Sequence, residues 1–285
     1  MNSPFRYPGG KFYARKLILN YIPEHSCYVE PFAGGASIFF AKDKVTYNWL
    51  NDVNKELMNC YTIIRDRAND LIEMLDGEKA TKERHAFYKN EFIPQNDLES
   101  AVRWYYLNRT SYSGIMNIRN CYWGYGDAYS MRPENWGNSI RQVSLKLQNV
   151  RLTALDFEEI IEQLVTEKLL EDSFLFIDPP YFKADQDKFY TNAFNNDDHF
   201  RLCRILRDYN DHFRFLITYD NVEEVKNLYR WSYAIHEKEW NYTINRTDDQ
   251  KNGTKRKGTR YKGKEIFIVN YDPLEAQLES QPELF

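Results

Sequence analysis

The chain has 285 residues, of which 42% are hydrophobic and 16% aromatic, and its formal net charge is −4. This composition supports a folded core and excludes a wholly disordered chain. No apolar run reaches the roughly 18 residues of a membrane helix, and the first residues contain no apolar signal region, so we expect a cytoplasmic protein. Taken alone, the negative charge argues against a nucleic-acid partner.

Cysteine and histidine residues are scattered along the chain. The four cysteines form no Cys-x-x-Cys pair, so the sequence predicts neither a structural zinc site nor a disulfide framework. We therefore expect reduced, mostly buried thiols and no bound metal.

The first elements in the chain are a strand, a small-residue turn and a helix. The strand is predicted at residues 27–30, the turn at 32–37 and the start of the helix at 38–41. A second strand is predicted at 45–49, shortly before Asp52. This order is typical of the beginning of a parallel α/β sheet.

The pattern changes in the middle of the chain. One long amphipathic helix is predicted from apolar residues that recur every three or four positions, namely Leu57, Tyr61, Ile64, Ala68, Leu71 and Leu75. Two more helices, near 81–92 and 97–107, precede an aromatic segment with no clear period at 108–138. The whole block 56–149 is therefore predicted to be inserted into the sheet.

Strand–helix alternation resumes after this block. The expected strands lie at 151–155, 173–177, 213–217, 232–239 and 265–271, and the expected helices lie near 158–170, 196–211 and 221–229. Strands separated by helices predict a parallel sheet. The acidic end of the chain, 272–285, is predicted to be a mobile tail.

The small-residue turn and Asp52 form the first chemical signal. The turn matches neither a Walker loop nor Gly-x-Gly-x-x-Gly, so no phosphate site is indicated. Small residues at the carboxyl end of a strand allow a ligand to approach the backbone closely. A carboxylate after the next strand, here Asp52, can hold ribose hydroxyls. Together they predict a nucleoside-containing cofactor.

The second signal is Asp178-Pro179-Pro180-Tyr181, which follows the apolar strand 173–177. The two prolines cannot continue a buried strand, because they lack the N–H groups of the ladder. The Asp178 carboxylate and the Pro179 carbonyl offer two adjacent hydrogen-bond acceptors, and Tyr181 offers an aromatic face. This set suits an exocyclic amino group on a planar base.

In sequence order, these motifs resemble those of the Dam-type DNA adenine N6-methyltransferases of the alpha group, over nearly the whole chain. The resemblance implies an α/β fold with a Rossmann-like methyltransferase sheet, helices on both faces and an inserted, mostly helical target-recognition domain. It implies a catalytic domain made of residues 1–55 and 150–271 and a recognition domain at 56–149. It also implies a DNA-associated protein of bacterial or phage origin that methylates the N6 amino group of a flipped-out adenine in double-stranded DNA.

The resemblance also implies roles for individual residues. S-adenosylmethionine would be the methyl donor, bound by Tyr7, Lys11, Glu30, Phe32, Gly34, Asp52, Asp156, Phe157 and Asp178. The catalytic set would be Asp178, Pro179, Pro180 and Tyr181. Ala36 stands where many members of the family have glycine, a change small enough to preserve function. The Leu-Asn-Arg segment at 106–114 matches the family, but the Gly-x-Phe-Asn-x-Pro pattern is absent after Gly114, so the target sequence stays open.

Positive charge is concentrated where DNA is expected to bind. Residues 246–264 contain eight basic and two acidic side chains, and a local excess of this size can bind phosphates whatever the total charge. The predicted DNA contacts are Arg109, Tyr112, Arg119, Lys255, Arg256, Lys257 and Arg260.

Two further segments and two alternative functions complete the predictions. The loop 182–195 is predicted to be a lid over the site, and 281–285 (Gln281 to Phe285) resembles peptides that dock onto bacterial sliding clamps. Because Asp-Pro-Pro-Tyr suits any exocyclic amine, an RNA base methyltransferase is one alternative; the inserted block favours duplex DNA. The other is an inactive DNA-binding regulator, against which the intact motifs argue.

Overall fold

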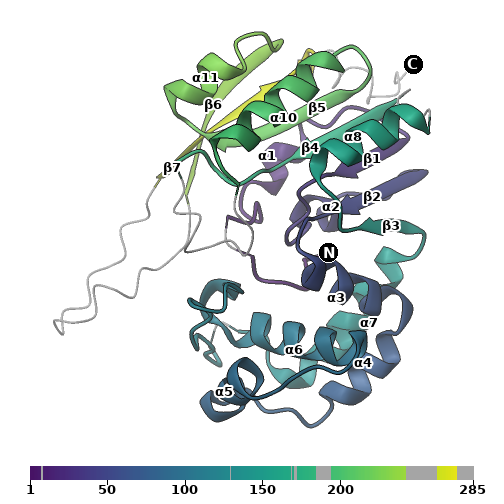
Figure 1. Ribbon diagram of the computed structural model, residues 1–285, viewed down its shortest axis with the longest axis vertical. Helices are drawn as coiled ribbons and strands as arrows, with labels where there is room; N and C mark the ends of the chain where they lie inside the picture. Colours follow the sequence, from purple (N-terminus) through teal and green to yellow (C-terminus); the bar gives the residue numbers. More distant parts are fainter. Residues whose placement is uncertain are drawn as a thin grey trace, which may run out of the picture.

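Seven strands form one sheet in the part of the chain that the computed structural model describes, in the order β3-β2-β1-β4-β5-β7-β6 (Figure 1). The described residues are 1–7, 9–128, 130–167, 169, 172–183, 194–241 and 262–274. The strands are β1 (Cys27–Glu30), β2 (Tyr47–Asn51), β3 (Val150–Thr153), β4 (Ser173–Ile177), β5 (Arg214–Asp220), β6 (Ala234–Asn241) and β7 (Lys262–Val269).

Strands β1 to β5 are parallel, and β7 runs antiparallel to both of its neighbours, β5 and β6. The carboxyl ends of β1 to β5 therefore meet at one edge of the sheet, where ligands bind in such folds. Because β7 runs the opposite way, its first half lies at that edge. Glu265 of β7 pairs there with Asp220, the last residue of β5.

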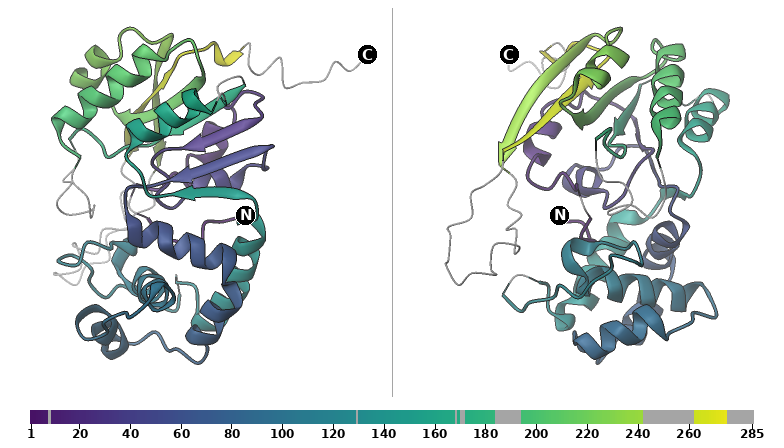
Figure 2. Two further views of the ribbon diagram at one scale, coloured as in Figure 1. Left: turned by 45° about the vertical axis from the view of Figure 1, so that its right-hand side comes forward. Right: turned by 60° about the vertical axis from the view of Figure 1, so that its left-hand side comes forward.

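Helices cover both faces of this sheet (Figure 2). On one face the core includes residues of α1 (Arg15–Leu19) and α2 (Ser37–Ala41). On the other it includes residues of α8 (Phe157–Thr166), α10 (Asn196–Asp208) and α11 (Glu223–Leu228). All five residues of β4 are buried, and its last four alternate between the two cores, as expected for a central parallel strand.

A helical body lies beyond the β3 edge of the sheet (Figures 1 and 2). It contains α3 (Lys55–Asp66), α4 (Ala68–Leu75), α5 (Lys82–Asn90), α6 (Asp97–Thr110) and α7 (Trp136–Leu147). Helix α6 is buried along most of its length, including its last seven residues, so it forms the centre of this body. One continuous apolar core joins the helical body to the sheet.

The predicted α/β sheet is confirmed, and strands 27–30 and 173–177 have the predicted bounds. The second strand instead spans Tyr47–Asn51, because the Asn48 side chain exchanges two hydrogen bonds with the backbone of Val45 and closes a turn before the strand.

Two helix predictions need correction, and one further helix was not predicted. The single long helix is two helices, α3 and α4, separated at Arg67, whose φ of −135° and ψ of 38° are not helical. Helix α7 lies partly within the segment predicted to be irregular, although Trp136, Ile140, Val143 and Leu147 have helical spacing and are buried. The five-residue helix α1 is too short to produce a periodic signal.

Two further observations concern the described residues. Among the described helices, none is both long and apolar enough to cross a membrane. The four cysteines are free and buried.

Candidate active site

The Asp-Pro-Pro-Tyr turn follows directly on β4, at the carboxyl edge of the sheet. Its far end is fixed by Asp220, whose carboxylate accepts hydrogen bonds from the backbone N–H groups of Phe182 (2.9 Å) and Lys183 (3.0 Å). The turn is therefore anchored to the neighbouring strand as well as to its own.

Asp178 is held through one of its two carboxylate oxygens. Lys11 Nζ and Thr218 Oγ1 each donate a hydrogen bond to Asp178 Oδ1, both at 2.6 Å. The Lys11 side chain is only 2% exposed, whereas that of Asp178 is 21% exposed. The carboxylate therefore rests on buried donors and still reaches the surface of the site.

A second carboxyl group, Glu265, lies behind this pair. Its Oε2 atom is 3.9 Å from Lys11 Nζ, and the Tyr181 hydroxyl favours the charged form of its carboxyl group. Lys11 Nζ also lies 4.9 Å from the centroid of the Tyr181 ring. Burial raises the pKa of Glu265 to about 7, although Lys11 and the Tyr181 hydroxyl oppose this shift.

The glycines of the turn after β1 make room for Tyr7. Gly34 has a φ of +47°, and a Cβ atom there would lie 2.9 Å from the Tyr7 ring. A Cβ atom on Gly35 would lie 3.1 Å from the Tyr7 side chain. The small residues therefore allow the N-terminal segment to pack directly on the turn.

Asp52 connects this turn to helix α3. Its carboxylate accepts backbone hydrogen bonds from Gly34 and Asn54, both at 2.9 Å. Asn54 in turn caps α3 by accepting a hydrogen bond from Leu57 N. Burial raises the pKa of Asp52 above its usual value, and the two backbone donors oppose that shift.

Asn51 is a site residue that the sequence prediction did not single out. It is fully buried, and its side-chain amide donates to the carbonyls of Pro31 and Leu155. Its Oδ1 atom accepts from Leu155 N and Thr153 Oγ1, while its backbone carbonyl accepts from Ala33 N. One asparagine thus joins the loops that follow β1 and β3 to the end of β2.

Glu30 is buried at the end of β1. Its Oε1 atom accepts hydrogen bonds from the Tyr28 hydroxyl (2.7 Å) and from Phe39 N (2.9 Å). Burial raises the pKa of Glu30 to about 8. At neutral pH this side chain is therefore mostly a neutral carboxylic acid.

Phe32 and Phe157 bring the loops after β1 and β3 together. Their rings stack with centroids 5.5 Å apart, and Phe157 is almost fully buried. Asp156 caps helix α8 by accepting from Glu158 N, and its carboxylate also pairs with Arg201 at 2.8 Å.

The predicted site residues therefore fall into three contacting sets. The first is Lys11, Asp178 and Tyr181; the second is Tyr7, Gly34 and Asp52; the third is Phe32 and Phe157. Glu30 and Asp156 have other partners. Sequence reasoning missed four residues that organise these sets, namely Asn51, Thr218, Asp220 and Glu265. Of these, Asn51 was detectable, because it stands beside Asp52 at a predicted strand end.

The Leu-Asn-Arg segment binds the N-terminal segment of the chain. Asn108 accepts a hydrogen bond from Arg6 N (3.0 Å) and donates one to Arg6 O (2.7 Å). Arg109 is 6% exposed and donates to Pro4 O, and burial lowers its pKa. The prediction that Arg109 contacts DNA therefore needs correction, because its side chain points into the protein interior.

Two other predicted DNA-contact residues are exposed. Tyr112 and Arg119 lie in the loop after α6, which pairs with itself through a bridge between Ser111 and Trp123. Three sets of predicted residues lie outside the described part of the chain. They are the lid residues 184–193, the segment 281–285, and the basic residues Lys255, Arg256, Lys257 and Arg260.

Comparison with known proteins shows that the chain is similar to one family of DNA methyltransferases. The family model of the D12 class N6 adenine-specific DNA methyltransferases matches residues 7–244. The type II methyltransferase M.MjaIII of Methanocaldococcus jannaschii is 28% identical over 238 residues, which cover 72% of this chain and 79% of that protein. The type II methyltransferase M.CviBI of Paramecium bursaria Chlorella virus NC1A is 25% identical over 260 residues, which cover 89% of this chain and 97% of that protein.

Shorter matches point the same way. The DNA adenine methylase of Escherichia coli K12 is 31% identical over 115 residues, which cover 39% of this chain and 41% of that protein. The DNA N-6-adenine-methyltransferase of Escherichia phage P1 is 28% identical over 80% of this chain, but the match covers only 31% of the phage protein.

Proposed function

Because the chain belongs to the D12 class of N6 adenine-specific DNA methyltransferases, it methylates adenine N6 in DNA, and we propose that Asp178, Pro179 and Tyr181 hold the amino group for that transfer. The proposal rests mainly on the hydrogen bonds of Asp178. Among the described residues its donors are Lys11 and Thr218, and both bind its Oδ1 atom. The Oδ2 atom of this partly exposed side chain is then the acceptor for an N6 hydrogen.

The two acceptors act on the lone pair of N6. In free adenine this lone pair is delocalised into the ring, so the nitrogen is a weak nucleophile. Hydrogen bonds from its two N–H groups to Asp178 and to the Pro179 carbonyl favour a tetrahedral N6, so the lone pair loses its conjugation with the ring and points toward the methyl group. Positive charge develops on N6 as the new N–C bond forms, and the Asp178 carboxylate stabilises it. One N6 proton then leaves, to Asp178 or to water.

S-adenosylmethionine is the methyl donor that the family implies, and when bound it supplies the methyl group as an electrophile. The side chains at the carboxyl edge suit such a molecule: Asp52 is an acid for ribose hydroxyls, and Phe32 and Phe157 form an apolar wall. We assign donor binding to Tyr7, Lys11, Glu30, Phe32, Gly34, Asp52, Asp156, Phe157 and Asp178. For Lys11 and Tyr7, their contacts with Asp178 and Gly34 support an indirect role.

A base within a duplex cannot reach this edge, so the target adenine has to flip out of the helix. Tyr181 provides the ring on which it stacks. We further propose that residues 56–149 select the target sequence, with Tyr112 and Arg119 exposed toward DNA, while residues 1–55 and 150–271 carry out the chemistry. The basic stretch 246–264 supplies phosphate contacts.

Methylation mapping tests the function. The chain is expressed in a host that lacks DNA methylation, and N6-methyladenine is mapped in the host DNA. A modified sequence motif is expected with the wild-type chain and none with Asp178→Ala. Asp178→Ala should keep most of its affinity for S-adenosylmethionine through the other donor-binding residues, which heat stabilisation would show. Near wild-type methylation by this variant would refute the role of Asp178.

The alternatives are separated by substrate comparison. Methyl incorporation into duplex DNA, single-stranded DNA and RNA is measured side by side; preference for RNA would support the RNA enzyme. Heat stabilisation by S-adenosylmethionine without methylation of any substrate would support an inactive regulator. Because relatives include type II methyltransferases, the proposed context includes a restriction-modification system.

A further inference from the structure

Glu265 is a buried acid that the mechanism above does not use. Its exposed fraction is 2%, and it lies near the beginning of β7, beside the end of β5. An ionisable group is costly to bury unless its partners compensate. Two groups that favour its negative charge, Lys11 and the Tyr181 hydroxyl, both belong to the proposed site.

These contacts connect the two groups that handle the target base. Lys11 is shared, since its Nζ atom lies 2.6 Å from Asp178 Oδ1 and 3.9 Å from Glu265 Oε2. The Tyr181 hydroxyl favours the negative charge of the same glutamate. Moving Glu265 would therefore shift both the carboxylate that accepts the amino group and the ring on which the base stacks.

We propose that Glu265 is a positioning residue for methyl transfer, holding Lys11 and the Tyr181 hydroxyl so that the Tyr181 ring and Asp178 Oδ2 face the base in a fixed relation. The proposal rests on the proposed function of Asp178. Glu265 itself does not touch the base; it acts through Lys11 and Tyr181.

The charged groups around Glu265 make its ionisation sensitive to pH. Asp178 approaches from the turn after β4 and Asp220 from β5, and both disfavour its negative charge. Lys11 favours that charge, and on β6 Lys238 is paired with Glu265 in register. With its pKa raised to about 7, Glu265 changes charge near neutral pH. Lys11 and the Tyr181 hydroxyl both favour the ionised form of Glu265, so only this form holds them firmly. The kcat should therefore rise with pH through this range, as Glu265 loses its proton.

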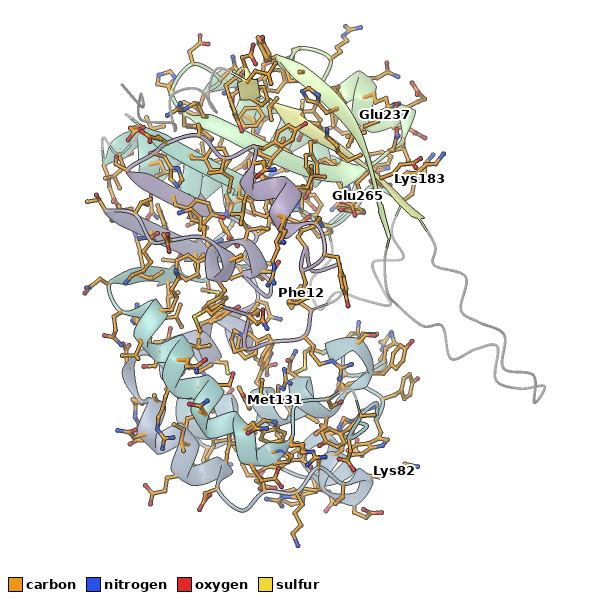
Figure 3. The ribbon with its side chains drawn as sticks, turned by 180° about the vertical axis from the view of Figure 1, so that it is seen from behind. Phe12, Lys82, Met131, Lys183, Glu237 and Glu265 are labelled. Carbon is orange, nitrogen blue, oxygen red and sulfur yellow. The ribbon has the colours of Figure 1, made fainter. Side chains whose placement is uncertain are left out.

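Glu265→Gln in the full-length chain is the central test, because the amide resembles the protonated acid in size. The matched control is Glu237→Gln on the neighbouring strand β6, and Figure 3 labels both glutamates. The Glu237 carboxylate is 63% exposed and pairs with Lys226. Loss of one charged, buried partner of Lys11 predicts a decrease in kcat of about tenfold at pH 8 for Glu265→Gln. The control should keep wild-type kcat.

Three further measurements distinguish positioning from a purely structural role. The dissociation constant of S-adenosylmethionine should change less than about threefold, since a tenfold change would correspond to ~1.4 kcal/mol at the donor site. The rise of kcat through about pH 7 in the wild type should disappear in Glu265→Gln. Tyr181→Phe should lower kcat and be less than additive with Glu265→Gln. Wild-type kcat and a wild-type pH profile in Glu265→Gln would overturn the proposal.

If Glu265→Gln does not fold, Tyr181→Phe tests the proposal instead, because it removes only the hydroxyl group and keeps the ring and every charge. Wild-type kcat and a wild-type pH profile in Tyr181→Phe would overturn the proposal. Asp178→Asn separates this inference from the proposed function. If Asp178→Asn stays active, the role of Asp178 fails. If Asp178→Asn is inactive while Glu265→Gln behaves as wild type, only the role of Glu265 fails.

Discussion

The two halves of the sheet edge hold their polar side chains in different ways. On the β4–β5–β7 side, the Lys11 ammonium group pairs with the carboxyl groups of both Asp178 and Glu265. On the β1–β2–β3 side, Asp52 and Asn51 contact mainly backbone groups of the neighbouring loops. Contacts between side chains depend on charge state, whereas backbone contacts fix the shape of a loop. The first half is therefore the one that pH and charge substitutions can alter.

The largest effect is expected from Lys11→Met on the charged side. This change removes the cation that lies between Asp178 and Glu265, and an acid that loses its buried partner costs about 3–5 kcal/mol of unfolding free energy. Chemical denaturation measures this loss. Lys226→Met is the control, since its partners Glu223 and Glu237 are 80% and 63% exposed and surface pairs contribute only about 0–1 kcal/mol. Equal losses in the two variants would contradict the special position of Lys11.

Asn51→Ala tests the backbone-linked side. It leaves the buried backbone groups of Pro31 and Leu155 without their partner, which should cost about 2–4 kcal/mol and raise the KM for S-adenosylmethionine. The control is Asn59→Ala, whose exposed side chain donates only to Asp97 O among its described contacts. A loss no greater than that of Asn59→Ala would show that Asn51 does not organise these loops.

Glu30 makes a pH-dependent prediction. Its pKa is raised from 4.5 to about 8 in the folded chain, so the unfolded chain loses this proton at lower pH than the folded chain. Stability is therefore fully present below about pH 4.5 and is lost as pH rises toward 8. Between pH 6 and 8 this group should remove about 2 kcal/mol. Glu30→Gln cannot lose a proton, so denaturation of the two proteins at both pH values should give a flatter profile for the variant. Parallel profiles would refute the assignment.

The smallest expected effect on stability concerns the contact between Tyr7 and the turn after β1. Gly34→Ala and Gly77→Ala both place a Cβ atom on a residue with positive φ, +47° and +71°. Only the Cβ atom at position 34 meets a neighbour, the Tyr7 ring at 2.9 Å, whereas nothing lies within 4 Å at position 77. Gly34→Ala should therefore be less stable than Gly77→Ala by about 1 kcal/mol in thermal or chemical unfolding. Equal stabilities would mean that Tyr7 moves aside freely.

The sequence predicted the groups that follow strand ends, because local patterns mark both the strand and its last residue. Asp178 and Asp52 are of this kind. It did not predict a site role for Thr218 or Glu265, since their partners are distant in the chain and no local pattern marks either residue as part of the site. Arg109 shows the same limit in reverse: its burial depends on the docking of Pro4 and Arg6 against α6, which no local pattern reveals.

The pairing of Lys11 with residues far along the chain has a consequence for biosynthesis. Asp178 is synthesised 167 residues after Lys11, and Glu265 follows Lys11 by 254 residues. Contacts of such high sequence separation form late in folding, because a long loop has to close first. A nascent chain on the ribosome can thus build β1 to β5 before its catalytic carboxylate is fully supported. Premature termination upstream of β7 should then yield polypeptides that fold in part but cannot modify the genome.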